Sequence, residues 1–104
     1  MITITVKKRN DAYVSFVSKG HAGYAENGKD IVCAAVSFQM YSLEGWCSVH
    51  ADELRKHSSK IGDGMFEIYF EGKAGKSVFE MAVIGFKQLQ ETYPKHIKIE
   101  YEEI

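Results

Sequence analysis

Residues 28–37 read Gly-Lys-Asp-Ile-Val-Cys-Ala-Ala-Val-Ser, and this stretch decides how the rest of the chain divides into elements. Asp30 is a favoured residue type at a helix N-cap, because its carboxylate accepts hydrogen bonds from the amides of the first turn. The residues after it are apolar at most helix-compatible positions and include no proline up to about Arg55. We therefore predict a long helix over residues 31–55. Its first two turns are apolar on all sides, which predicts burial against more than one surface.

The residues before this helix predict a β-hairpin followed by a loop. Ile2, Ile4 and Val6 alternate with polar residues, and residues 12–18 alternate again after a polar turn. Residues 19–29 contain three glycines and show no periodicity, so we expect a loop there.

The residues after the long helix predict the second half of a small α+β domain. Gly62-Asp63-Gly64 marks a turn. The elements that follow are a strand over 65–71, a loop over 72–76, a helix up to residue 93 and a strand over 97–101. Ser77 and Glu80 have the spacing of a capping box at the start of the helix, and Pro94 stops it. The order β-β-α-β-α-β predicts a single domain over residues 1–104, with a small mixed or antiparallel sheet backed by two helices.

Charge and hydropathy exclude several classes of partner. The 13 basic and 14 acidic residues give a net charge of −1, so we expect no direct binding to nucleic acid. No stretch approaches the roughly 18 apolar residues that a membrane span requires. The early charges do not fit a secretory signal, so we expect a cytosolic protein.

The two cysteines are predicted to be free thiols. Cys33 and Cys47 are 14 residues apart on the predicted helix, which separates them by roughly 21 Å. A disulfide needs Cα atoms within about 7 Å, so the two cannot pair with each other.

Cys33 is the third residue of the predicted helix, where unpaired amides and the helix dipole favour a thiolate. His21, on the loop that leads into this helix, is placed to fold back toward the thiol as its base. The unpaired amides around Cys33 are candidates for an oxyanion hole. Asp30 has two possible roles, to orient the His21 imidazole or only to cap the helix.

Simpler interpretations of the same residues stay open at this point. A lone cysteine in an apolar helix is most often a buried small hydrophobe, and a histidine between glycines is most often a solvated loop residue. Residues 72–77, Gly-Lys-Ala-Gly-Lys-Ser, look like the end of a P-loop but lack its first glycine, because position 70 is Phe70. Cys47, His50 and His57 lack the spacing of a zinc motif, so we expect no metal or other cofactor. The very apolar first helix leaves room for a homodimer.

The residues Gly20-His21-Ala22, followed by residues 28–37, resemble the ribosomal-processing cysteine protease Prp family of bacteria. The resemblance extends in length and element order over essentially the whole chain. It implies a Cys-His endopeptidase that removes a short N-terminal extension from the large-subunit ribosomal protein numbered twenty-seven. It also implies His21 and Cys33 as the catalytic pair, with Gly20, Asp30 and Ser37 as supporting residues. Two alternatives remain: a non-enzymatic, ribosome-associated binding module of the same fold, and a phosphate-binding protein that uses Lys73 and Lys76.

Overall fold

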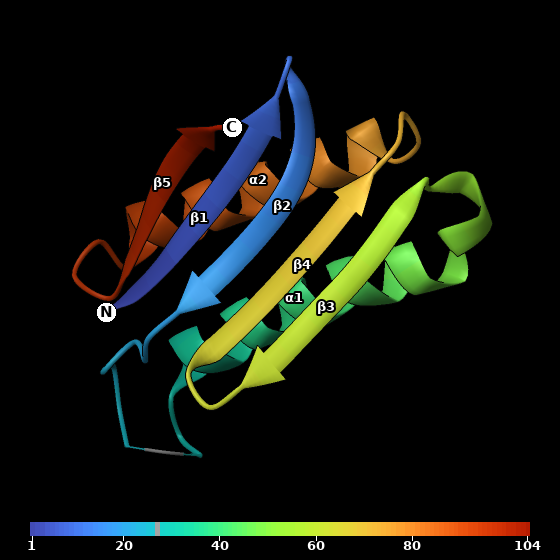
Figure 1. Ribbon diagram of the computed structural model, residues 1–104. Coiled ribbons are helices and arrows are strands. Elements are labelled where there is room, and N and C mark those ends of the chain that lie inside the picture. Colours follow the sequence, from blue (N-terminus) through green and yellow to red (C-terminus); the bar gives the residue numbers. More distant parts are fainter. Residues whose placement is uncertain (27) are drawn as a thin grey trace.

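The computed structural model describes residues 1–26 and 28–104, in which a five-stranded sheet carries two helices on one face (Figure 1). The strand order across the sheet is β3-β4-β2-β1-β5. Neighbouring strands are antiparallel except β1 and β5, which are parallel. The elements are β1 (Ile2–Arg9), β2 (Ala12–Lys19), α1 (Ile31–Val49), a 3₁₀ turn (Ala51–Glu53), β3 (Lys56–Gly62), β4 (Met65–Glu71), α2 (Lys76–Thr92) and β5 (Ile97–Glu103). The α+β class with two helices behind a mixed sheet is confirmed.

The first helix is shorter than predicted, and the chain uses the difference to build an additional strand. α1 ends at Val49, where His50 leaves the helical conformation and its N–H bonds to the Trp46 carbonyl. Residues 56–62 then form β3 at the edge of the sheet rather than the end of a helix. Every residue of β3 is at least partly exposed. The segment therefore lacks the alternation of apolar and polar residues from which a strand is predicted.

The helix starts match one prediction and contradict two others. Asp30 caps α1 as predicted. The capping box is wrong, because α2 begins at Lys76 with the left-handed Gly75 as its cap and no side-chain cap bond. The first turns of α1 are not buried all round either: Val32 faces the core, whereas Ile31 is 55% exposed. A helix that lies on a sheet buries one face only.

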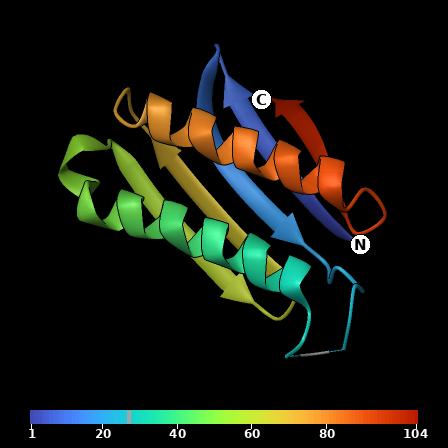
Figure 2. The same cartoon turned by 180° about the vertical axis from the view of Figure 1, so that it is seen from behind.

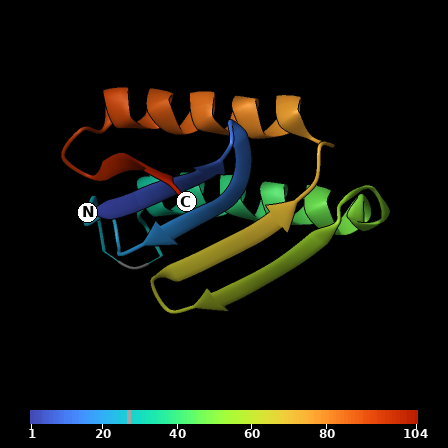
Figure 3. The same ribbon diagram turned by 45° about the horizontal axis from the view of Figure 1, so that its top comes forward.

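The core lies between the sheet and the two helices (Figures 2 and 3). The alternating residues Ile2, Ile4 and Val6 of β1 point into it, as their spacing predicts. The fully buried rings of Phe16 and Phe70 stack with centroids 6.0 Å apart, and further apolar residues of α1 and α2 close the layer. None of the helices in the described part of the chain is long and apolar enough to cross a membrane.

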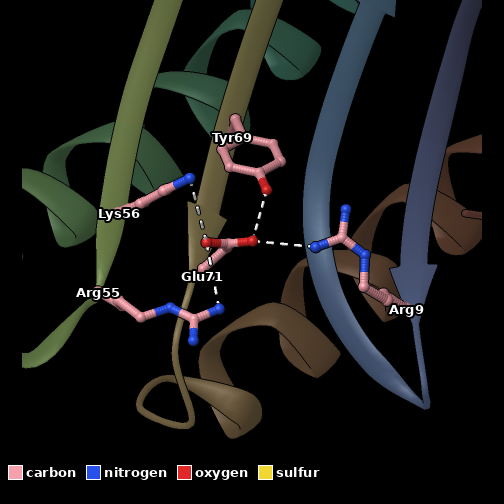
Figure 4. A network of polar contacts seen from close by, with 5 residues as sticks. All are labelled: Arg9, Arg55, Lys56, Tyr69 and Glu71. Atoms are coloured by element: carbon pink, nitrogen blue, oxygen red, sulfur yellow. Dashed lines mark hydrogen bonds and ion pairs between the residues drawn. The ribbon is translucent and has the colours of Figure 1, made fainter.

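The opposite face of the sheet carries no helix (Figure 3), and a charged cluster joins three of its strands there. Glu71 of β4 accepts hydrogen bonds from the Arg9 guanidinium at 3.0 Å and the Tyr69 hydroxyl at 2.7 Å. Arg55 and Lys56 approach its second carboxylate oxygen at 3.3 and 3.9 Å (Figure 4). The Glu71 side chain is only 8% exposed. Its buried charge is balanced by Arg9 on one side and by Arg55 and Lys56 on the other.

Candidate active site

Gly20 turns the chain out of β2 and brings His21 toward the turn between β3 and β4. Gly20 has a φ of +94°, which glycine adopts readily and other residues rarely adopt. A Cβ at this position would lie 2.5 Å from the backbone oxygen of Met1. The Gly20 N–H donates to the carbonyl of Gly64 over 2.8 Å. The backbone before His21 is therefore fixed to the β3–β4 turn. The positive φ and the close approach to Met1 explain the glycine at this position.

Cys33 lies in the first turn of α1 and is tied to the same loop through its sulfur. The buried Ala22 donates its N–H to Cys33 Sγ over 3.3 Å. The thiol is partly buried rather than sealed in the core. The bond from Ala22 places the residue next to His21 directly beside the thiol.

His21 and Cys33 line one open cleft of about 180 Å³ between α1 and the β3–β4 hairpin. The His21 side chain is 59% exposed, so its ring is accessible from solvent. The predicted supporting residues Gly20 and Ser37 line the same cleft, Ser37 one helical turn after Cys33. The remaining lining residues are largely apolar: Ile2, Ser18, Val36, Tyr41, Ile61, Gly62, Gly64, Met65 and Phe66. The cleft thus combines a thiol, an imidazole and an apolar wall, which suits covalent chemistry on a peptide.

Both oxygens of the Asp30 carboxylate are occupied by backbone amides. Oδ1 accepts from Val32 and Cys33 at 3.0 and 2.9 Å, and Oδ2 accepts from Tyr24 and Ala25 at 3.0 and 3.4 Å. Desolvation raises the pKa of this carboxyl group, but the amide hydrogen bonds outweigh it and hold the pKa below its usual range. Asp30 therefore fixes the start of α1 and the loop before it.

This arrangement overturns the predicted oxyanion hole. The N–H groups of Val32 and Cys33 donate to the Asp30 carboxylate, and the N–H of Ala34 donates to the Asp30 carbonyl at 3.0 Å. An acidic N-cap uses the same amides that an oxyanion hole would need.

The carboxylate next to His21 belongs to Asp63, with Oδ1 3.7 Å from the ring Nε2. The sequence marks Asp63 only as part of the Gly62-Asp63-Gly64 turn. Nothing in that pattern connects it with a histidine so far away along the chain.

The second thiol differs from the first in its burial. Cys47 is fully buried, and both cysteines are free, as predicted. Burial, assisted by the nearby Glu44, raises the pKa of the Cys47 thiol to about 11. Such a thiol is protonated and inaccessible at neutral pH.

The other polar motifs have separate partners. His50 stacks on Trp46, and His57 lies 3.4 Å from Glu44. Within residues 1–26 and 28–104 no three His, Cys, Asp or Glu side chains come together as a metal site would require. Lys73 and Lys76 line a second cleft of about 300 Å³ beside the β1–β2 turn, away from Cys33.

Comparisons with known proteins give a consistent family. Residues 1–98 match the family model described as cysteine protease Prp. The ribosomal processing cysteine protease Prp of Mycoplasma genitalium is 32% identical over 87 residues, which are 83% of this chain and 86% of the relative. The crystal structure of SMU.848 from Streptococcus mutans is 30% identical with a TM-score of 0.76, covering 100% of this chain and 96% of that one.

One further structure supports the fold alone. It is the essential ribosomal processing protease Prp from S. aureus, in complex with a covalently linked product peptide. Its TM-score is 0.84 at 20% identity, covering 98% of this chain and 100% of that one.

Proposed function

Because the chain belongs to the cysteine protease Prp family, we propose that residues 1–104 act as one protease domain with Cys33 as nucleophile and His21 as base. Its proposed substrate is the N-terminal extension of the large-subunit ribosomal protein numbered twenty-seven. The observation that carries the proposal is the cleft that His21 and Cys33 share. The substrate rests on the family resemblance and on the ribosomal processing in the name of the Mycoplasma relative.

The first half of the proposed reaction forms an acyl-enzyme. His21 takes the thiol proton of Cys33, and the thiolate attacks the carbonyl carbon of the scissile bond. The Ala22 N–H, 3.3 Å from the sulfur, keeps the loop that carries His21 beside the thiol before attack. When the tetrahedral intermediate collapses, the carbon–nitrogen bond breaks and the His21 imidazolium gives its proton to the leaving amine. A thioester between Cys33 and the extension remains.

The second half returns the enzyme to its starting state. A water molecule enters the open cleft, gives a proton to His21 and attacks the thioester carbonyl. Collapse of this intermediate breaks the carbon–sulfur bond and releases the extension as a carboxylic acid, which loses its proton to solvent. The thiolate takes back the proton that the His21 imidazolium holds. Neither half requires a metal or an organic cofactor.

The three supporting residues act on the positions of the reacting groups. Gly20 fixes the backbone before His21 through its bond to Gly64. Asp30 fixes the first turn of α1, and with it Cys33, through its two bonds to Val32 and Cys33. Ser37 lines the cleft one turn beyond Cys33.

Mass spectrometry of the ribosomal precursor, after incubation with wild type, Cys33→Ala and His21→Ala, tests the proposal. We expect wild type to remove the extension and both variants to lose nearly all cleavage with unchanged circular dichroism. Cys47→Ala is the matched control that keeps activity. A wild type that binds the precursor and leaves it intact would instead support the alternative, a ribosome-associated binding module.

We also propose that the protein acts in the cytosol, and on a peptide rather than on nucleic acid.

We propose further that the protein acts as a homodimer. The helices expose several large apolar side chains outside the cleft, which a second copy would cover: Ile31, Phe38 and Val49 on α1, and Met81 and Ile84 on α2. Light scattering that gives twice the chain mass of 11.8 kDa would support the dimer. A mass of one chain at micromolar concentration would contradict it.

A further inference from the structure

The His21 ring rests against the β3–β4 turn. Its Nε2 lies 3.7 Å from Asp63 Oδ1. A Cβ added to Gly64 would lie 3.0 Å from the same nitrogen, so the ring packs directly over that glycine. The bond from Gly20 N–H to the Gly64 carbonyl holds the turn and the His21 loop together. The turn therefore meets the Nε2 edge of the imidazole in two ways: the Gly64 backbone packs against it, and the Asp63 carboxylate lies beside it.

We propose that Asp63 is a positioning residue for His21, an inference that rests on the function proposed above. Its carboxylate lies beside the Nε2 edge. We assign the proton exchange with Cys33, which lines the same cleft, to the other ring nitrogen, Nδ1. When Nδ1 takes the thiol proton, the imidazolium lies beside the Asp63 carboxylate. Asp63 thus stabilises the charged form of the base without touching the substrate.

The other charged or polar groups at this loop contact its backbone instead of the ring. The Met1 ammonium donates to the His21 carbonyl at 2.7 Å, and His96 Nδ1 lies 3.0 Å from the Ala22 carbonyl. The Asp30 carboxylate is occupied by four amides. Asp63 is accordingly the carboxylate that the described residues place at the imidazole.

The exposure of the pair sets the size of the effect. The side chains of His21 and Asp63 are 59% and 99% exposed, so water and salt screen their attraction. We expect a loss of kcat of about two- to fivefold on removal of the charge, the range that exposed ion pairs give. The loss should disappear at high ionic strength.

The test compares wild type, Asp63→Asn and Asp63→Glu at about 10 mM and about 1 M salt, where the Debye length falls from roughly 30 to roughly 3 Å. Asparagine keeps the shape of the side chain and suits a turn, so Asp63→Asn removes only the charge. At low salt we expect Asp63→Asn to lower kcat with KM unchanged and Asp63→Glu to restore most of it. At high salt wild type and Asp63→Asn should converge. Asp52→Asn, on the exposed 3₁₀ turn, is the control that stays at the wild-type rate.

The rate of Cys33 alkylation by iodoacetamide is a second readout that needs no peptide substrate. Asp63→Asn should slow it about two- to fivefold at low salt, since the imidazolium beside the thiolate is less stable. Equal kcat and equal alkylation in wild type and Asp63→Asn would overturn the inference. A rise in KM alone would also overturn it, because Asp63 would then act on the substrate. If wild type cleaves no precursor but Asp63→Asn still slows alkylation, the proposed function fails and the positioning of His21 by Asp63 is supported.

Discussion

At the scale of single residues, the two thiols show how one helix places the same side chain in two different environments. Cys33 lies at the open end of α1, beside a cleft and under the N–H of Ala22. Cys47 lies farther along the same helix, on the face that packs into the core. Depth and local donors, rather than the helix itself, separate a candidate nucleophile from a core residue.

Iodoacetamide at neutral pH should therefore label Cys33 and leave Cys47 unmodified. The Cys47 thiol has a pKa of about 11 and no exposed surface, so neither its ionisation nor its access permits reaction in the folded state. Peptide mapping by mass spectrometry gives the site of modification. Cys33→Ala should take up no label until urea unfolds it. Equal labelling of both thiols in the folded protein would contradict the assignment of Cys33 as nucleophile.

The sequence predicts the parts of the site that depend on local position. The helix start at Asp30 follows from the N-cap preference, and it places Cys33 in the first turn. The use of the first-turn amides by the Asp30 carboxylate could be foreseen only by counting donors and acceptors. The approach of Asp63 to His21 depends on how β3 and β4 pair with the rest of the sheet, and such long-range contacts leave no periodic signal in the chain.

At the scale of elements, burial on one face decides which segments the sequence predicts. β1 and β4 each bury alternate residues, so the spacing of their apolar residues predicts both strands. β3 lies at the edge with nearly all of its side chains in solvent, so its residues follow no period of two. The predicted helix extends past the observed end of α1 for the same reason: the residues after Val49 are mostly exposed and carry no pattern that distinguishes a helix from a strand.

Two glycines near the helices should respond to the same substitution with opposite sign. Gly75 has a φ of +81°, and a Cβ there would lie 2.6 Å from the Trp46 ring, so Gly75→Ala should cost about 1–3 kcal/mol of unfolding free energy. Gly45 lies inside α1 with nothing within 4 Å of an added Cβ. Gly45→Ala should stabilise the protein by about 0.5–1 kcal/mol. Urea denaturation of both variants measures the two changes, and a loss in each would refute the open space at Gly45.

At the scale of the whole molecule, the sheet is held together by contacts between distant parts of the chain. β5 pairs in parallel with β1, so the last strand lies beside the first. The Glu71 cluster then ties the end of β1, the start of β3 and the end of β4 together on the open face (Figure 4). One carboxylate thus joins elements that come from both halves of the sequence.

Glu71→Gln should destabilise the protein at neutral pH and make its stability less sensitive to acid. The hydrogen bond from Tyr69 lowers the pKa of Glu71, partial burial opposes this, and the charges of Arg55 and Lys56 with the bond from Arg9 complete a net lowering. A carboxyl group with a lowered pKa in the folded state contributes stability above the unfolded pKa, about 4.3. That stability is lost as the pH falls through the folded pKa, because Glu71 is then protonated in both the folded and the unfolded state.

The gap between wild type and Glu71→Gln in urea midpoint should therefore be full at pH 7, shrink below the ordinary glutamate pKa, and close at strongly acidic pH. Glu80→Gln, at an exposed position of α2, is the control that tracks wild type across the range. A gap that stays constant from neutral to strongly acidic pH would mean that the shape of the Glu71 side chain, rather than its charge, holds the three strands together. A closing gap would show that ionised Glu71 stabilises the sheet at the end remote from the Cys33 cleft.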